Sequence, residues 1–195
     1  MVKRASAGRP EVTSHAAIEQ AAFRLFAERG FEATTLEAIA REVGVGRRTL
    51  FRYYRSKNDI PWGQFDRTLE GFRQILAETP EGVGVHAAIG RAVVEFNRFP
   101  ADASPSHVDR MRLLLGTPAL QAHSALRYAE WRRVIAEYAA ARLGCAPDDL
   151  EPRLLGHVAL ALALSAYEVW LDHPDQDVTD LLGRGLAALE TLVRS

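Results

Sequence analysis

The turn at Gly44-Val45-Gly46 constrains the fold of this chain more than any other stretch, because helical patterns lie on both sides of it. Over residues 36–43, just before the glycines, apolar side chains recur at helical spacing. A dinucleotide-binding loop would need a strand there and a third glycine where Thr49 stands. The glycines are therefore predicted to join two helices. Gly44 can adopt the left-handed conformation that ends the first helix, and Gly46 is expected to let the chain enter the second.

Nearly all of the remaining sequence also has helical periodicity, without convincing strand-like alternation, so the chain is predicted to be all-α. Capping boxes at Thr34 with Glu37 and at Ser56 with Asp59 mark two helix starts. Pro61 indicates that the helix after Ser56 begins nearer Asp59 or is kinked. The predicted helices span residues 14–29, 34–43, 47–54, 56–77, 83–99, 106–115, 119–143, 150–172 and 178–194.

Charge is distributed unevenly along the chain. Residues 1–57 carry eleven Lys and Arg against six Glu, whereas residues 58–195 carry thirteen against nineteen Asp and Glu. A basic segment joined to a mildly acidic one fits a polyanion-binding head on a body that does not touch the polyanion, although random scatter of charge is the simpler alternative. We therefore expect two domains, residues 1–57 and residues 58–195.

The first three predicted helices have the arrangement of a helix-turn-helix DNA reader, whose last helix enters the major groove. That helix is too short to be stable alone, so Leu50 and Tyr54 are expected to pack against the other two. Arginines at its start are suited to guanine edges, and hydroxyls and Lys57 to phosphates; the alternative is a solvated basic face. The candidate DNA contacts are Thr35, Arg47, Arg48, Thr49, Arg52, Tyr53 and Lys57, with Arg9 on a basic N-terminal arm.

Residues 14–60 resemble the DNA-binding region of the TetR family of bacterial repressors. The matching motifs are LFAERGF, TTLEAIA and GVGRRTLFRYYRSK. Gly46 stands where the family prefers Ser, which removes a side-chain helix cap, and Phe51 stands where the family often has a DNA-contacting Tyr. The run SKNDIPWGQFD is also similar to regulators associated with mycofactocin gene clusters. The resemblance implies an all-α homodimer, a palindromic DNA operator, and repression relieved when a small molecule binds the C-terminal domain.

Aromatic and flexible apolar residues of the C-terminal part are suited to an apolar ligand pocket, although each of them is also an ordinary core residue. No charged cluster indicates a strongly ionic ligand, so the favoured effector is apolar or of acyl type, with acyl-CoA as one candidate. The candidate pocket residues are Trp62, Phe65, Phe72, Met111, Tyr128, Trp131 and Tyr167.

The last two predicted helices resemble the pair that forms a four-helix bundle with a second copy in this family, although an intramolecular core is the alternative. The candidate dimer residues are Leu155, Val158, Leu162, Leu182, Leu186 and Leu189. The apolar run over residues 154–171 includes His157 and Glu168, which makes a membrane span an unfavourable interpretation.

The N-terminus lacks the apolar run of a signal peptide, so we expect a cytoplasmic protein. The single cysteine, Cys145, excludes an intrachain disulfide, and no spacing indicates a metal site or a cofactor. No nucleophile and base stand out as a catalytic pair, so an enzyme on a helical scaffold is the weakest interpretation. A DNA-binding regulator without a ligand is the closer alternative.

Overall fold

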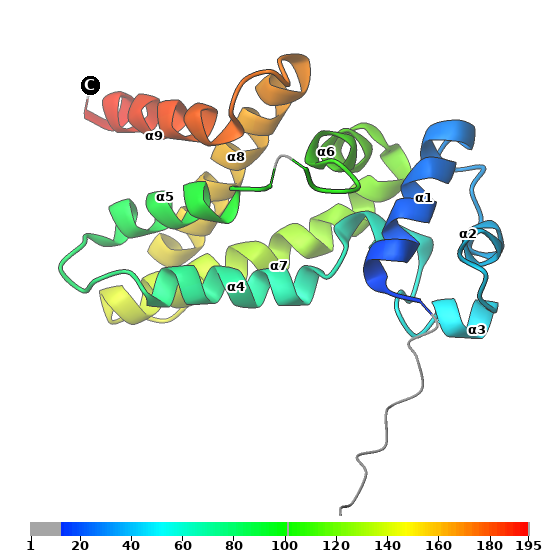
Figure 1. Cartoon of the computed structure of the whole chain (residues 1–195). Helices are drawn as coiled ribbons and strands as arrows, with labels where there is room; N and C mark the ends of the chain where they lie inside the picture. Colours follow the sequence, from blue (N-terminus) through cyan, green and yellow to red (C-terminus); the bar gives the residue numbers. More distant parts are fainter. Residues whose placement is uncertain (1–12, 101, 195) are drawn as a thin grey trace, which may run out of the picture. The chain divides into compact units, whose positions relative to one another are not determined.

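The computed structural model describes residues 13–100 and 102–194, and in these residues every regular element is a helix (Figure 1), as the all-α prediction requires. The described residues form two compact units, which divide between Gly63 and Gln64. The division falls after Gly63, whereas the sequence places the boundary after Lys57.

The first unit contains α1 (His15–Arg29), α2 (Leu36–Val43), α3 (Arg47–Leu50) and the 3-10 helix η1 (Lys57–Trp62). Ser14 caps α1, because its hydroxyl accepts a hydrogen bond from the Ala17 N–H at 3.2 Å. Leu50 and Tyr54 are buried, which confirms that they anchor the short third helix. The core of the unit consists of Ile18, Ala21, Ala22, Leu25, Phe26, Phe31, Ile39, Ala40, Leu50, Tyr54 and Ile60.

The start of α2 differs from the predicted capping box. The cap is Thr35, whose hydroxyl accepts from the Ala38 N–H at 3.1 Å. Thr34 is buried, and its hydroxyl donates to the main-chain carbonyls of Leu25 and Gly30 at 3.2 and 2.8 Å. Thr34 therefore ties the loop to the end of α1, and the predicted cap at Thr34 is wrong by one residue.

The turn between α2 and α3 follows the predicted chemistry. Gly44 has φ +75° and ends α2 in the left-handed region, where residues with a Cβ are strained. Gly46 has an ordinary φ of −74° and caps α3 without a side-chain hydrogen bond. The helix is shorter than the predicted 47–54, and the chain continues through turns in which the Tyr54 N–H still donates to the Leu50 carbonyl at 3.1 Å.

The predicted helix over residues 56–77 is interrupted. The Ser56 and Asp59 capping box is present, but the helix it starts is η1, which contains Pro61 and ends at Gly63 with φ +60°. The next helix begins only at Phe65. The break therefore lies at the glycine, because its backbone conformation is one that a 3-10 or α-helix cannot continue.

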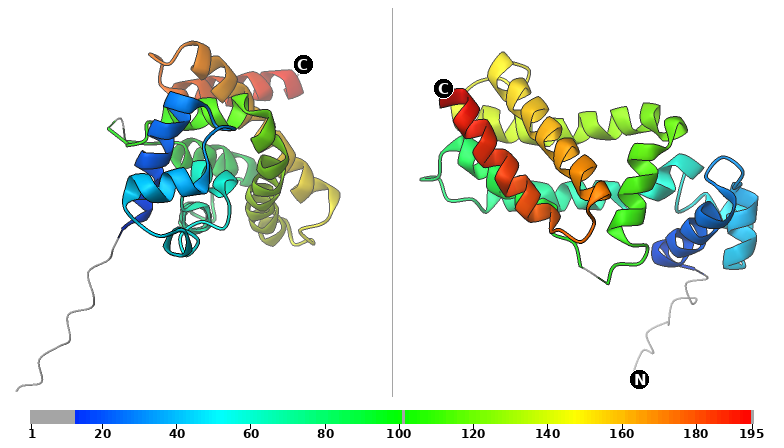
Figure 2. Two further views of the ribbon diagram at one scale, coloured as in Figure 1. Left: turned by 90° about the vertical axis from the view of Figure 1, so that its right-hand side faces the viewer. Right: turned by 90° about the horizontal axis from the view of Figure 1, so that it is seen from above.

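The second unit contains α4 (Phe65–Ala77), α5 (Val85–Phe96), α6 (His107–Gly116), α7 (Pro118–Leu143), α8 (Leu150–Asp172) and α9 (Val178–Arg194). In this unit α4 lies along α5 and α7, α8 packs against α7, and α9 lies beside α8 (Figure 2). The predicted ranges of the last three helices agree with the structure to within a residue. Gly156 allows the close approach of α8 to α7, because a Cβ there would lie 2.9 Å from the Arg132 carbonyl oxygen.

Candidate nucleic-acid interface

The exposed surface of α3 and of the turn after it is rich in arginine. Arg47, Arg48 and Arg52 are exposed, and Arg55 follows them on the same surface segment. Buried Leu50 and Tyr54 hold the segment from behind, so the arginines are presented on an anchored backbone. Guanidinium groups on such a backbone can bind phosphate oxygens or the paired acceptors of a guanine edge.

Arg47 is held by two neighbours. Its guanidinium forms an ion pair with the Glu37 carboxylate at 2.8 Å and lies 5.3 Å from the centre of the Phe51 ring. Thr35, which caps α2, is exposed, and Thr49 is half-buried on α3. The ion pair thus joins the start of α2, which Thr35 caps, to the start of α3, which carries Thr49. Arg9 lies outside the described residues.

Tyr53 occupies a different role from the predicted phosphate contact. Its hydroxyl donates to the Thr13 carbonyl at 2.7 Å, and its ring lies edge-to-face with the His15 ring, with ring centres 5.0 Å apart. A phosphate oxygen only accepts hydrogen bonds, so contact with it would require Tyr53 to break the bond to Thr13. The phosphate contact of Tyr53 stays a prediction, and this hydrogen bond to Thr13 competes with it.

Lys57 also serves the fold. Its ammonium donates to the main-chain carbonyls of Phe31, Glu32 and Thr34 at 2.7, 3.3 and 2.9 Å, and it lies 4.3 Å from the centre of the Phe31 ring. An ammonium has three donors, and all three are used by these carbonyls. Lys57 joins η1 to the loop between α1 and α2, which is a better account of it than the predicted phosphate contact.

We expect Lys57→Met to destabilise the first unit by about 1.5–3 kcal/mol, because hydrogen bonds to a charged group are lost. Chemical denaturation followed by circular dichroism measures this, with Arg55→Met as the control that removes an equal charge from an exposed site. A Lys57→Met protein as stable as the wild type, with weakened DNA binding, would instead restore the phosphate role.

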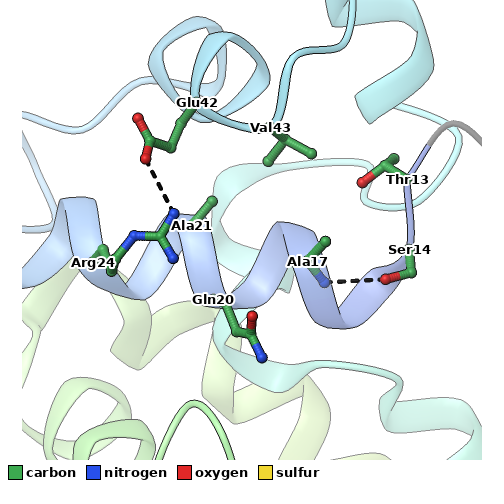
Figure 3. A pocket seen from close by; sticks show the side chains of 8 residues that line it. All are labelled: Thr13, Ser14, Ala17, Gln20, Ala21, Arg24, Glu42 and Val43. Atoms are coloured by element: carbon green, nitrogen blue, oxygen red, sulfur yellow. Dashed lines mark hydrogen bonds and ion pairs between the residues drawn. The ribbon is translucent and has the colours of Figure 1, made fainter.

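A polar groove lies along the N-terminal half of α1 beside the end of α2 (Figure 3). Its volume is about 470 Å³, and the ion pair between Arg24 and Glu42, at 3.1 Å, bridges the two helices within it. The Thr13 hydroxyl lines it and is buried without a hydrogen-bond partner in the described part of the chain. The sequence did not indicate this groove, since its residues come from α1, the two residues before it and the end of α2, which only folding brings together. The lining residues are Thr13, Ser14, Ala17, Gln20, Ala21, Arg24, Glu42 and Val43.

The predicted pocket residues fall into separate groups. Trp62 belongs to the first unit. In the second unit, Phe72 stacks on Trp131 with ring centres 5.2 Å apart, and both are buried in the core. Phe65 and Met111 are buried as well. Burial, and to a smaller extent the nearby Tyr128, raise the pKa of the Tyr167 hydroxyl far above its usual value.

A chain of polar side chains crosses this apolar unit. The Tyr167 hydroxyl donates to Asn97 Oδ1 at 2.5 Å, Asn97 Nδ2 donates to the Val93 carbonyl at 2.7 Å, and His107 Nε2 lies 2.8 Å from the Tyr167 hydroxyl. The chain connects α5, α6 and α8. The His107 ring is also stacked on Phe99 at 3.7 Å. Burial, assisted by the positive charge of Arg110, lowers the pKa of His107 from 6.5 to about 3.

This pKa predicts how stability depends on pH. Unfolded His107 binds a proton below about pH 6.5, but the folded protein resists protonation until about pH 3. The free energy of unfolding should therefore fall with decreasing pH across this window, by up to about 1.4 kcal/mol per pH unit. Urea denaturation of wild type and His107→Gln at about pH 7.5 and about pH 5.5 isolates the contribution. Equal pH dependence in the two proteins would contradict it.

The candidate dimer residues differ in how deeply they are buried in their own chain. Leu182 is fully buried in its own chain, so its assignment to a dimer interface is wrong. Leu155, Val158, Leu162, Leu186 and Leu189 are half-buried. A Cβ on Gly185 would lie 2.5 Å from a methyl of Leu162, and one on Gly90 would lie 3.1 Å from a methyl of Leu186, so both leucines pack within the unit.

One face of α8 remains exposed. It carries Leu154, His157, Ala161, Ser165 and Val169 at helical spacing. Among the helices of the described residues, α8 is the one that is long and apolar enough to cross a membrane by length and composition, yet only 33% of its most apolar stretch is buried. An apolar helix surface of this kind usually marks an interaction site. Within the described residues, no three His, Cys, Asp or Glu side chains are grouped to hold a metal ion.

Comparison with known proteins gives matches over both units. Residues 18–60 match the description "Bacterial regulatory proteins, tetR family", and residues 83–194 match "MftR C-terminal domain". The chain is 41% identical over 176 residues to the protein assigned as mycofactocin biosynthesis transcriptional regulator MftR in Mycobacterium tuberculosis, covering 90% of this chain and 89% of that one.

Two crystal structures have the same fold at low sequence identity. The repressor FadR of Thermus thermophilus, in complex with lauroyl-CoA, aligns with a TM-score of 0.55 and 23% identity over 90% of this chain and 93% of its own. The regulator FadR of Bacillus subtilis, in complex with stearoyl-CoA, aligns with a TM-score of 0.62 and 15% identity over 90% and 97%.

Proposed function

Because this chain belongs to the TetR family of bacterial DNA-binding transcriptional regulators, with a C-terminal domain of the MftR type, we propose that it is a homodimeric repressor released from its operator by a small apolar or acyl-type ligand. The observation that carries the proposal is the set of exposed arginines on α3, which Leu50 and Tyr54 anchor from behind. In this proposal the repressor acts in the cytoplasm, which contains the operator DNA.

In this proposal some residues of the interface read bases and others bind phosphates. Arg47 and Arg48, at the start of α3, read base edges in the major groove. Arg52, Thr35 and Thr49 bind phosphates, which fixes the register of the helix on DNA. Arg9, whose position the structure does not describe, contacts the minor groove or flanking phosphates.

The second copy binds through the exposed face of α8. A helix-turn-helix dimer places two reading helices in successive major grooves, so an operator with two-fold symmetry is expected. The small side chains of Ala161 and Ser165 allow close approach of two helices, and Leu154 and Val169 supply apolar area. Of the predicted set, Leu155 and Val158 lie half-buried at the edge of this face.

The ligand binds in the second unit. Both FadR structures contain acyl-CoA, and the second unit here combines a large aromatic interior with the polar chain from His107 to Asn97. A mostly apolar site with few polar groups is suited to an acyl chain. We propose that the acyl chain contacts Phe65, Met111, Tyr128 and Tyr167. In this proposal Phe72 and Trp131, in the core, support these four residues.

A binding experiment tests the proposal. The wild-type protein is used to select duplexes from a random-sequence library, and the dissociation constant of the selected duplex is measured with lauroyl-CoA, stearoyl-CoA or CoA alone. Weaker binding with the acyl thioesters and unchanged binding with CoA support a ligand-responsive repressor. If no acyl thioester changes DNA binding, the proposed acyl-type ligand is wrong and the protein is a ligand-independent regulator. If the library yields no enriched sequence, the proposed DNA-reading function is wrong.

A further inference from the structure

The ion pair between Glu37 and Arg47 joins the two helices of the reading unit. Glu37 lies in the first turn of α2, and Arg47 is the first residue of α3. Their charged atoms are 2.8 Å apart, although the side chains are 50% and 64% exposed. An exposed ion pair contributes little to folding stability. The main effect of this ion pair is therefore on the orientation and charge of Arg47.

Two contacts restrict Arg47. The Glu37 carboxylate forms an ion pair with one side of the guanidinium. The guanidinium carbon lies 5.3 Å from the centre of the Phe51 ring. An arginine has five N–H donors in a planar fork, so an ion pair through Nη1 leaves donors for a base edge. A side chain that is already oriented loses less conformational entropy when it binds.

The carboxylate also changes the local charge. Arg47 without Glu37 would be a free cation that any phosphate attracts, whatever the base sequence. With Glu37 beside it, the pair has no net charge, and a phosphate that approaches Arg47 is repelled by the carboxylate. The guanine edge offers neutral acceptors, so it suffers less from this repulsion.

We propose that Glu37 is a positioning and specificity-determining residue, which orients Arg47 toward a base edge and weakens its binding to phosphates. The proposal rests on the DNA-reading function proposed above. It assigns to α2 a share in sequence discrimination that does not require Glu37 itself to touch DNA.

The test uses Glu37→Gln, Arg47→Ala and the double variant in the full-length protein. The probes are the duplex that the wild type selects from a random-sequence library, its single-base variants, and the unselected pool. Affinities are measured over a range of salt concentrations. Glu42→Gln is the matched control, because Glu42 is another exposed glutamate of α2 whose ion pair, at 3.1 Å, is with Arg24 of α1.

Glu37→Gln is expected to bind the unselected pool roughly three- to tenfold more tightly at low salt and to increase the salt slope by about one phosphate per reading helix. It should also lose preference at the base position that Arg47→Ala identifies. In the Arg47→Ala background it should change neither quantity, and Glu42→Gln should retain the wild-type base preference. Melting temperatures near that of wild type show that the variants are folded.

Glu37→Gln with the wild-type preference for the selected duplex over the pool would overturn the proposal. So would an effect of equal size in the Arg47→Ala background, because Glu37 would then act without Arg47. Failure of the wild type to enrich any sequence would instead count against the DNA-reading function on which the proposal rests.

Discussion

Replacing Ala161 by glutamate is expected to turn the protein into a monomer that no longer holds its operator. Ala161 lies in the middle of the exposed face of α8, between His157 and Ser165. In a two-fold interface both copies contribute the new carboxylate, and each buried ion without a partner costs several kcal/mol. Glutamate is a good helix former, so α8 itself should remain folded.

The monomer is detected by analytical ultracentrifugation, and the loss of operator affinity by titration of the selected duplex. Ala141→Glu is the control, because Ala141 is an exposed alanine of α7 in the same unit. It should leave the dimer intact. An Ala161→Glu protein that sediments as a dimer would show that another surface joins the two copies.

Replacing Arg48 by alanine should cause the second large loss. Arg48 is exposed at the second position of α3, and a bidentate contact with guanine is worth about 1–3 kcal/mol of discrimination. A dimer presents Arg48 twice, so affinity for the operator should fall by at least tenfold while binding to random DNA changes less. Arg47→Ala should behave similarly, at a different base position.

Titration of operator variants with single-base changes provides the measurement. Arg29→Ala is the control, since Arg29 is an exposed arginine in the last turn of α1. It should retain the full base preference. If Arg47→Ala and Arg48→Ala both kept the wild-type preference as well, the reading helix would have to contact DNA through other residues.

Helix bounds were predictable because turn-forming residues separate the helices, as in the exact agreement for α8 and α9. The sequence predicts less well which of two similar neighbouring residues takes a given structural role. Thr34 and Thr35 are chemically equivalent as caps, and only the packing of the loop against α1 decides that Thr34 turns inward to two carbonyls. Pro61 marked the right region, but Gly63 ends the helix, because the break depends on backbone conformation.

The site residues show the same limit. Sequence identifies Lys57 as a cation near the DNA-reading segment, but its carbonyl partners lie far away in the chain and are brought near only by folding. The apolar stripe of α9 likewise does not reveal which leucines cover the chain's own core. Leu182 does so completely, whereas Leu186 and Leu189 do so partly. The proposed contacts of Arg48 and Arg52 remain predictions.

The polar chain through Tyr167 has a direction. The Asn97 Nδ2 amide donates to the Val93 carbonyl, so Asn97 Oδ1 must accept the single hydrogen bond that the Tyr167 hydroxyl can donate. The Tyr167 oxygen can then only accept, which assigns the proton of neutral His107 to Nε2. His107 is thus held as one tautomer with an unprotonated Nδ1, and nitrogen-15 NMR of the imidazole ring can observe it directly. A molecule that meets Nδ1 must offer a hydrogen-bond donor, because an acceptor there would need either a second proton on His107 or a Tyr167 hydroxyl turned from Asn97 to Nε2.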